Sequence, residues 1–329
     1  MQPTADSPAP LTSRSARLRA LRMNGPRKRQ PGNDARRGFW LGVGAYGFWG
    51  ILPIYFKALA AVGPVDIVAH RILWSVPFLA ILLVGFAGFG EVREAVGNPR
   101  VIGLLCATAV LIGINWLLYV YAVTSGRILA GSLGYYLNPL VNVLLGRIVL
   151  KERLTPLQWI AVGIAALGIG GLAVQALGQL WISLALAASF ATYGLLRKIA
   201  PVDAIAGLAI ETTLLLPAAL VWLGFGIAAG RPFFGPSTTD MVLLILAGVA
   251  TTVPLILFTA AARRLRYSTL GMLQFIAPTL QFLCAVVIYG ERLTPAHAVA
   301  FGSIWVALAL YVAALIRVPK AAGSAMTPE

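Results

Sequence analysis

The sequence predicts an all-α polytopic membrane protein whose ten transmembrane helices form two inverted five-helix repeats. The first observation is composition: 59% of the 329 residues are apolar and only 11% are charged, whereas about 25% are charged in an average soluble domain. The second is a series of ten apolar runs of about the 20 residues that a spanning helix needs. The third is an internal sequence repeat. Together they predict one membrane domain without a separate soluble domain.

The apolar runs follow one another along almost the whole chain. Each is expected to be a helix, because a lone segment in hydrocarbon must satisfy its own backbone hydrogen bonds. None shows the alternation of a β-barrel strand. The predicted spans are 39–61, 66–86, 101–123, 128–149 and 157–176, then 180–197, 204–228, 241–262, 268–289 and 296–316.

Basic residues gather in the N-terminal tail and in alternate links between the spans. With the N-terminus inside, all but five of the 26 lysines and arginines fall on the cytoplasmic side. This bias orients inner-membrane proteins, so both termini are expected in the cytoplasm. The net charge of +15 is therefore interpreted as a topology signal and not as nucleic-acid binding. Tail residues such as Arg36 and Arg37 are expected to contact anionic membrane lipids.

The internal repeat relates the two halves of the chain. NPLVNVLLGRIVLKERLTP, from Asn138, aligns without gaps to APTLQFLCAVVIYGERLTP, from Ala277, and PVD at 64–66 recurs at 201–203. Because each half has an odd number of spans, the second copy enters the membrane from the opposite face. Such inverted repeats recur in secondary transporters that open one site alternately to each side. The sequence therefore predicts solute transport.

These boundaries divide the chain into four parts. They are a disordered basic cytoplasmic tail at 1–37, the first repeat at 38–176, the second repeat at 177–316 and a cytoplasmic C-terminal tail at 317–329. The N-terminal tail is rich in Pro, Ser and Arg. It has too little apolar surface to offset the entropy of ordering.

Several motifs between residues 38 and 316 are specific enough to identify a family. In the first half they are AYGFWGILPIYFK (45–57), HRILWS (70–75), NWLLYVYAV (115–123), LGYYLNPLVNVLLG (133–146) and ERLTPLQW (152–159). In the second half they are YGLLRK (193–198), IETTLLLP (210–217), AARRLRYSTLGMLQFIAPTLQF (261–282) and IWVALALY (304–311). With these motifs the chain resembles the drug/metabolite transporter superfamily, in particular its EamA-type members called RarD.

The resemblance implies a ten-helix permease of the bacterial inner membrane, of the kind described as a chloramphenicol-sensitivity or chloramphenicol-resistance permease. It covers most of the chain but not the basic tail before Arg36, which is longer than the family pattern. Met1 and Met23 are therefore alternative starts.

Few ionisable residues are expected at membrane depth, where a charge is costly unless it faces water or a partner. His70 and Arg71 lie about a turn into the second span, and Glu211 lies within the seventh. Aligning Pro77 with Pro217 places Arg71 and Glu211 at matching positions, six residues before the proline. We expect a charge pair or a substrate site between them, or two separately stabilised residues. Glu211 is also the candidate for proton coupling.

A second set of candidates is uncharged. Amides can bind substrate or hold helices together, each bond contributing about 1 kcal/mol; they are Asn115, Asn138, Asn142, Gln274 and Gln281. Aromatic rings suit amphipathic solutes but also pack helices; they are Tyr46, Trp49, Tyr119, Tyr135, Tyr136 and Tyr193. Asn115 and Tyr119 lie four residues apart and therefore share one helix face. Both interpretations stay open for each set.

The repeated ERLTP segments predict helix starts. Thr155 and Thr294 are expected to be N-caps, with Pro156 and Pro295 at the first helical position. Three basic residues at helix ends are expected to be interfacial anchors: Lys57, Arg197 and Lys198.

Small residues four apart also mark the fifth and tenth spans. Ala166 with Gly170, and Ala298 with Gly302, permit close helix contact. This contact is expected within one protomer or in a homodimer.

Signatures of enzymes are missing from the sequence. There is no HExxH, no Cys or His cluster at ligand spacing and no Walker-type phosphate loop. No cofactor or metal is expected, and the partner is a small-molecule substrate. We expect an exporter of amphipathic metabolites or drugs; a membrane enzyme, a scaffold or a lipid-handling protein stay as alternatives.

Overall fold

Every regular element that the computed structural model describes is helical. The structure describes residues 31–125, 127–175, 177–290 and 295–317. The helices of the first half are α2 Pro31–Ala58, α3 Pro64–Leu82, η1 Leu83–Ala87, α4 Gly90–Gly97, α5 Pro99–Thr124, α6 Ile128–Ile148 and α7 Pro156–Gln175. Those of the second half are η2 Leu177–Gln179, α8 Leu180–Ile199, α9 Ala204–Ala228, α10 Thr238–Ala262, α11 Tyr267–Leu273, α12 Ile276–Leu283, η3 Cys284–Ile288 and α13 Pro295–Arg317.

Nine stretches among the described residues are long and apolar enough to cross a membrane. They correspond to all the predicted spans except 128–149, which is helix α6. That helix carries Asn138, Asn142 and Arg147 within its length. The polytopic all-helical class is confirmed. The count of ten spans and the inversion of the two halves stay predictions.

Helix α2 begins earlier than expected. It starts at Pro31, so the prediction of a disordered tail is wrong for residues 31–37. Residues 1–30 and the C-terminal tail from residue 318 lie outside the described part of the chain. So do residues 291–294, which include the expected N-cap Thr294.

The predicted span 268–289 is a series of three short helices, α11, α12 and η3. The break between the first two lies at Gln274 and Phe275. Pro278 accounts for it, because proline has no N–H to donate to the carbonyl four residues earlier. The chain therefore bends at Gln274.

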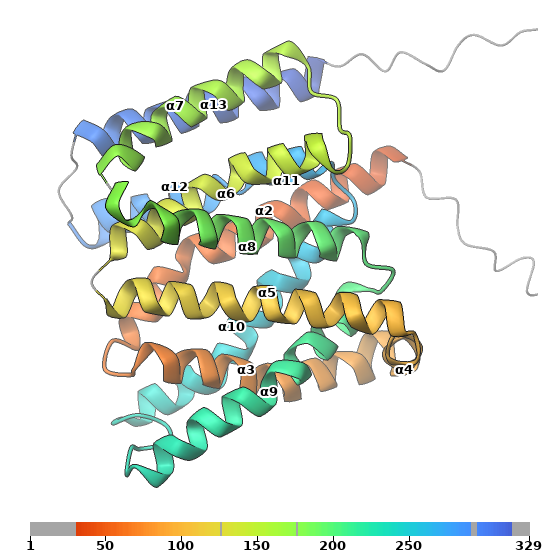
Figure 1. Cartoon of the computed structure of the whole chain (residues 1–329), viewed down its shortest axis with the longest axis vertical. Helices are drawn as coiled ribbons and strands as arrows, with labels where there is room; N and C mark the ends of the chain where they lie inside the picture. Colours follow the sequence, from red (N-terminus) through yellow and green to blue (C-terminus); the bar gives the residue numbers. More distant parts are fainter. Residues whose placement is uncertain (1–30, 126, 176, 291–294, 318–329) are drawn as a thin grey trace, which may run out of the picture.

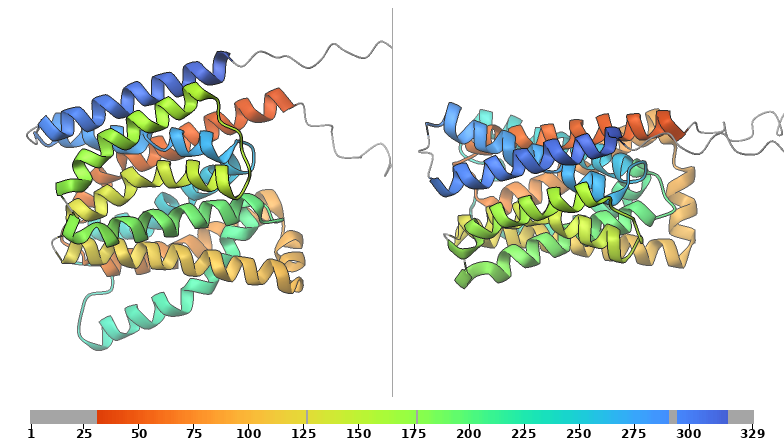
Figure 2. Two further views of the ribbon diagram at one scale, coloured as in Figure 1. Left: turned by 45° about the horizontal axis from the view of Figure 1, so that its top comes forward. Right: turned by 90° about the horizontal axis from the view of Figure 1, so that it is seen from above.

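The helices form a bundle with two distinct ends (Figure 1). Pro31, where α2 begins, and Arg317, where α13 ends, lie at the same end, which we call the terminal end. The opposite end, where α2 ends and α3 begins, is the far end. Seen from other directions in Figure 2, the long helices run between these ends.

The closest helix pairs join the first half of the chain to the second. Helix α7 packs on α13, α6 on α8 and α11, and α3 on α10 and α9, while α2 packs on α10 and α12. The two halves are thus interleaved and do not form separate domains. In Figure 1, α7 and α13 lie together at one edge of the bundle.

The small residues predicted in α7 do not make the contact with α13. Ala166 and Gly170 are exposed, whereas a Cβ added to Gly168 would lie 2.5 Å from the Cβ of Ser303. Gly168 is therefore the close approach between these helices. A homodimer through the exposed positions stays a prediction.

Helices α3 and α10 approach each other even more closely. A Cβ added to Gly248 would lie 2.4 Å from the backbone of Trp74, and the Ser75 hydroxyl donates to the Gly248 carbonyl at 3.3 Å. Because backbone cannot move aside easily, only glycine fits here. This contact holds Arg71, one turn away in α3, at a fixed depth.

Candidate functional site

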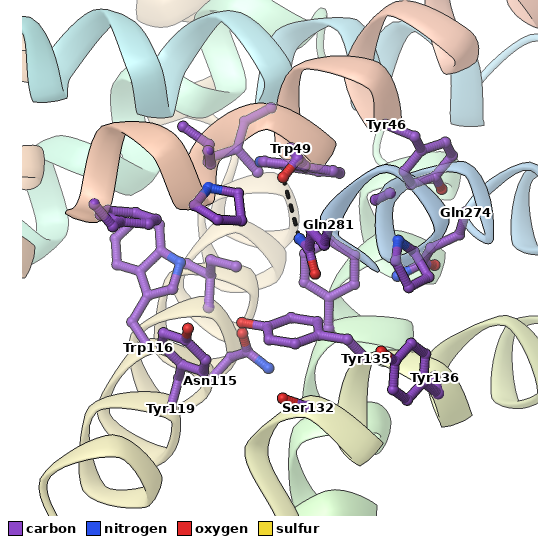
Figure 3. A pocket seen from close by; sticks show the side chains of 18 of the residues that line it. Tyr46, Trp49, Asn115, Trp116, Tyr119, Ser132, Tyr135, Tyr136, Gln274 and Gln281 are labelled. Atoms are coloured by element: carbon purple, nitrogen blue, oxygen red, sulfur yellow. Dashed lines mark hydrogen bonds between the residues drawn. The ribbon is translucent and has the colours of Figure 1, made fainter. Parts of the chain in front are cut away.

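A cavity of about 440 Å³ lies inside the bundle (Figure 3). It is lined by α2, α3, α5, α6, α8, α10, α12 and the bend between α11 and α12. The lining residues are Tyr46, Trp49, Leu52, Pro53, Phe56, Lys57, Val68, Arg71, Ile112, Asn115, Trp116, Tyr119, Ser132, Tyr135, Tyr136, Phe190, Leu255, Gln274, Ala277, Pro278 and Gln281. Because Lys57 is near the end of α2 and Tyr46 is three turns deeper, the cavity extends from the middle of the bundle toward the far end.

Aromatic rings make up much of the wall. Tyr119 and Tyr135 meet edge to face at a centroid distance of 5.6 Å, and Trp49 contacts Phe190 at 5.7 Å. Figure 3 shows the Tyr135 ring crossing the view between Gln281 and Ser132. Such a wall offers flat apolar faces and hydroxyl groups to one bound molecule.

The amides at the cavity also join helices. Asn115 Nδ2 donates to the Leu186 carbonyl and to Ser189 Oγ, both at 3.0 Å. Gln281 Nε2 donates to the Trp49 carbonyl at 3.1 Å (Figure 3). These side chains therefore hold helices together, and the same residues face the cavity.

Gln274 lies where the α11–α12 bend meets α6. Its Oε1 accepts a hydrogen bond from Asn142 Nδ2 at 2.8 Å. Asn142 is buried and does not line the cavity. The bend thus presents Gln274 to the cavity while Asn142 fixes its orientation.

Arg71 lies at the cavity on α3. Its Nε donates to Thr251 Oγ1 at 2.8 Å, and its guanidinium lies 5.0 Å from the Trp116 ring and 5.7 Å from the Phe56 ring. Helix α10 and the aromatic wall therefore position this cation.

Nine of the candidate residues from the sequence meet at this cavity: Tyr46, Trp49, Arg71, Asn115, Tyr119, Tyr135, Tyr136, Gln274 and Gln281. His70, Asn138, Tyr193 and Glu211 do not line it. His70 is buried at the far end, where its Nε2 contacts the Phe233 carbonyl at 2.7 Å and its Nδ1 accepts from Trp74 at 3.3 Å. It thereby holds the 229–237 segment against α3.

Asn138 is buried in α6 beside the cavity. Its amide atoms make no hydrogen bond to any other described residue. No contact among the described residues therefore supports the prediction that Asn138 binds substrate or joins helices.

The expected pair between Arg71 and Glu211 is wrong, because Glu211 has another partner. Arg197 Nε lies 3.5 Å from Glu211 Oε1, and the two side chains are 0% and 1% exposed. Thr108 donates to the same carboxylate at 2.5 Å and Tyr193 at 3.3 Å. The alternative in which neighbours stabilise Glu211 separately from Arg71 matches this geometry.

Arg197 was expected to be an interfacial anchor, and that expectation is also wrong. The side chain is fully buried and occupies space left free by Gly207, where an added Cβ would lie 2.1 Å from its Nη1. Gly207 precedes Glu211 by four residues and so lies on the same helix face. A glycine one turn before an intramembrane carboxylate is the sequence signal that was missed.

A chain of aromatic rings connects the cavity to this ion pair. Trp49 lies 5.7 Å from Phe258, and Phe258 stacks on Tyr193 at 6.4 Å. Tyr193 in turn donates to Glu211. The rings fill the bundle on the terminal side of the cavity.

Polar contacts close the terminal end. Glu152 accepts from the backbone N–H groups of Tyr267 and Ser268 at 2.5 and 3.0 Å, which places a carboxylate at the N-terminus of α11, where the helix dipole favours it. Lys198 Nζ donates to the carbonyls of Ala262 and Leu265 at 2.7 and 2.5 Å. The first bonds join the α6–α7 link to α11, and the second join α8 to the end of α10.

Trp116 is a cavity residue that the sequence analysis did not select. It precedes Tyr119 by three residues, so the helix-face argument applied to Asn115 and Tyr119 would have included it. Phe56 and Ser132 carried no comparable signal, because their place depends on how α2 and α6 pack.

Comparisons with known proteins agree with this architecture. Residues 36–174 match the EamA-like transporter family. An uncharacterized transporter of Pseudomonas aeruginosa is 49% identical over 282 residues, covering 84% of this chain and 94% of the relative. Protein RarD of Escherichia coli is 46% identical over 288 residues, covering 85% of this chain and 95% of the relative.

A solved structure described only as a protein crystal structure has a TM-score of 0.65 at 21% identity. The match covers 85% of this chain and 99% of the chain in the solved structure. At this identity it supports the fold alone. This chain aligns with nearly the full length of each of the two relatives. The chain therefore belongs to the EamA-like transporter family, among the relatives of RarD.

Proposed function

We propose that this chain is a secondary active transporter that exports small amphipathic metabolites or drugs by alternating access. The observation that carries the proposal is the cavity, whose aromatic and amide wall lies deep in the bundle and extends toward the far end. Its size is in the range that holds a small organic molecule. The polar contacts at the terminal end would have to break for the cavity to open there.

Helix packing supports an exchange between two equivalent halves. In the sequence repeat, α2 corresponds to α8, α3 to α9, α5 to α10 and α6 to α11–α12. The α2–α10 contact then has its counterpart in α8–α5, α3–α10 in α9–α5, and α6–α8 in α12–α2, and all these pairs are in contact. Such two-fold equivalence is what inverted repeats use to open one site alternately.

A backbone feature also recurs between the halves. Lys151 has a φ of 54°, and Gly290, its equivalent in the aligned segments, has a φ of 66°. Left-handed residues are uncommon outside glycine. Their occurrence at equivalent positions supports a common origin of the two halves.

We propose that the terminal end is cytoplasmic in a bacterial inner membrane. Most lysines and arginines of the spans and links lie there, as the positive-inside rule requires, and the first and last described helices have their outer termini there. The cavity would then face the periplasm, as in an outward-facing state of an exporter.

Proton coupling at Glu211 is part of the proposal. Uptake of a proton there would remove the counter-charge of Arg197 and loosen the contact between α8 and α9. The ring chain through Phe258 and Tyr193 would connect this change to the cavity. An imposed pH gradient should therefore alter transport by the wild-type chain and leave transport by Glu211→Gln unaltered.

Counterflow in liposomes tests transport itself. The purified full-length chain would be reconstituted and loaded with three naphthalene solutes of matched size, namely 1-naphthylacetate, 1-naphthylacetamide and 1-naphthylmethylammonium, and with a bacterial metabolite extract. We expect saturable exchange of at least one solute, reduced about tenfold by Trp49→Ala because one ring of the wall is lost.

Trp40→Ala is the matched control, since Trp40 lies on the same helix but is 62% exposed and outside the cavity. It should leave the exchange unchanged. No saturable exchange of any solute, with lipid scrambling in its place, would favour the lipid-handling alternative.

A further inference from the structure

Arg71 has no acidic partner among the described residues, unlike five other arginines of this protein. Arg197, Arg231, Arg263, Arg264 and Arg266 each lie within 4.0 Å of a carboxylate. Among the described residues, the contacts of Arg71 are Thr251 and the two rings of Phe56 and Trp116. Its charge is therefore not neutralised from within the bundle.

The position of Arg71 makes this absence significant. The residue lies in α3 within the stretch Pro64–Phe86 that is apolar enough to cross a membrane, and it faces the cavity. A cation at this depth is expensive and is found where it faces water, a partner or a substrate. For Arg71, a partner of opposite charge can be a solute bound in the cavity.

The remaining lining residues favour a negative guest. Lys57 is a second cation at the wall, with its Nζ 3.6 Å above the Tyr289 ring. The part of the lining that the structure describes contains no Asp or Glu. A cavity of one sign of charge with low-dielectric walls concentrates ions of the other sign. A cationic solute would find aromatic faces but no counter-charge, and it would be repelled by Arg71.

The hydrogen bonding of Arg71 leaves room for a carboxylate. Thr251 engages Nε, and the terminal nitrogens donate to no other described residue. Two parallel N–H groups of a guanidinium match the two oxygens of a carboxylate. The rings of Trp116, Tyr119 and Tyr135 line the same cavity and offer apolar faces to an aromatic body.

We propose that the cavity selects aromatic monocarboxylates, with the carboxylate bound by Arg71 and the ring system held by the aromatic wall. The binding claim stands on the cavity alone, and only its consequence for transport rests on the proposed function. The single anionic group follows from the single unpaired guanidinium. The aromatic body follows from the rings that surround it.

Binding to the full-length chain in detergent tests the charge preference. Calorimetric titration with 1-naphthylacetate, 1-naphthylacetamide and 1-naphthylmethylammonium compares an anion, a neutral amide and a cation of similar size. We expect the acetate to bind about tenfold or more tighter than the acetamide, because it gains charge-assisted hydrogen bonds. The ammonium compound should bind most weakly.

Two substitutions at Arg71 and one control substitution elsewhere test whether Arg71 causes the preference for the acetate. Arg71→Gln should reduce the difference between acetate and acetamide to about twofold or less, and Arg71→Lys should retain part of it. Arg231→Gln is the matched control, since Arg231 also lies 5.0 Å from a tryptophan ring, that of Trp222, but outside the cavity. It should leave all three affinities unchanged.

Equal or tighter binding of the acetamide or the ammonium compound by the wild-type chain would overturn the proposal. An acetate preference that survives Arg71→Gln would do the same. Exchange measurements in liposomes distinguish an error in the proposed substrate class from an error in the proposed transport function. Exchange of only the neutral or cationic solute would contradict the substrate class, whereas Arg71-dependent acetate binding without exchange would contradict transport and leave the binding site standing.

Discussion

The pair formed by Arg197 and Glu211 combines three helices at one buried point. Arg197 comes from α8, Glu211 from α9, and the hydroxyl of Thr108, which donates to the carboxylate, from α5. Desolvation of two charges offsets much of their attraction, so the pair adds little stability compared with an apolar pair. It is nevertheless sensitive to the loss of either member, because the remaining charge stays buried alone.

Arg197→Met should therefore destabilise the protein by about 3 kcal/mol. The reason is that Glu211, only 1% exposed, is left without its counter-charge. The double variant Arg197→Met with Glu211→Gln should recover most of the loss, because no charge then remains in the interior. Unfolding of the purified chain in detergent, followed for Arg197→Met, for Glu211→Gln and for the double variant, measures the coupling.

Arg100→Met provides the control for this experiment. Arg100 lies at the terminal end of α5 and is exposed, so its loss should change stability by less than about 0.5 kcal/mol. Losses from the two single variants that simply add in the double variant would show that the two charges are not coupled.

Sequence reasoning identified nine of the 21 residues that line the cavity, but not the partners of the buried charges. Asn115 and Tyr119 were predicted from their spacing on one helix face, and both line the cavity. The partner of Glu211 was not predictable in this way, since the repeat alignment related it to Arg71 while the fold brings Arg197 to it. Spacing along one helix fixes which residues share a face, whereas contacts between helices depend on packing that a single sequence does not encode locally.

Helix boundaries were predictable because they have local causes. Pro156 begins α7, and Thr155 caps it: the Thr155 Oγ1 accepts from Gln158 N–H at 3.3 Å while Gln158 Oε1 accepts from Thr155 N–H at 2.9 Å. This reciprocal pair is a capping box, and it confirms the predicted helix start. The early start of α2 and the break at Gln274 were missed, since a polar first turn and one proline do not alter the apolar pattern that defined the spans.

The link between α6 and α7 contains a strained residue. Lys151 is the non-glycine residue with positive φ among those described, at 54°, and a side chain in this region costs about 1 kcal/mol relative to glycine. Lys151→Gly should therefore raise the free energy of unfolding by about that amount. Thermal unfolding in detergent provides the measurement.

Lys151→Ala separates the backbone effect from the charge. It removes the ammonium group but keeps a Cβ at positive φ, so it should not give the stabilisation that glycine gives. Equal stabilisation by both variants would show that the lysine charge, and not the left-handed backbone, was unfavourable.

Interleaving of the two halves restricts how the protein can move. Because the closest helix pairs each contain one member from each half, opening of the terminal end must slide first-half helices against second-half helices. The break at Gln274 and the glycine contact at Gly248 lie on such cross-half surfaces. Alternating access in this bundle therefore depends on α6 being a true span, since without it the halves would not be equivalent.

Cysteine labelling on both sides of α6 tests this arrangement. In a background with Cys106→Ser and Cys284→Ala, Ser125→Cys and Arg153→Cys place single exposed thiols before and after α6, at the far and terminal ends. In intact bacteria, an impermeant maleimide should label Ser125→Cys, whereas Arg153→Cys should require permeabilised cells. Ala229→Cys, exposed at the far end after α9, is the second-half control and should label like Ser125→Cys. Labelling of Ser125→Cys and Arg153→Cys from the same side would mean that α6 does not cross the membrane, since two thiols on either side of one span cannot share a compartment.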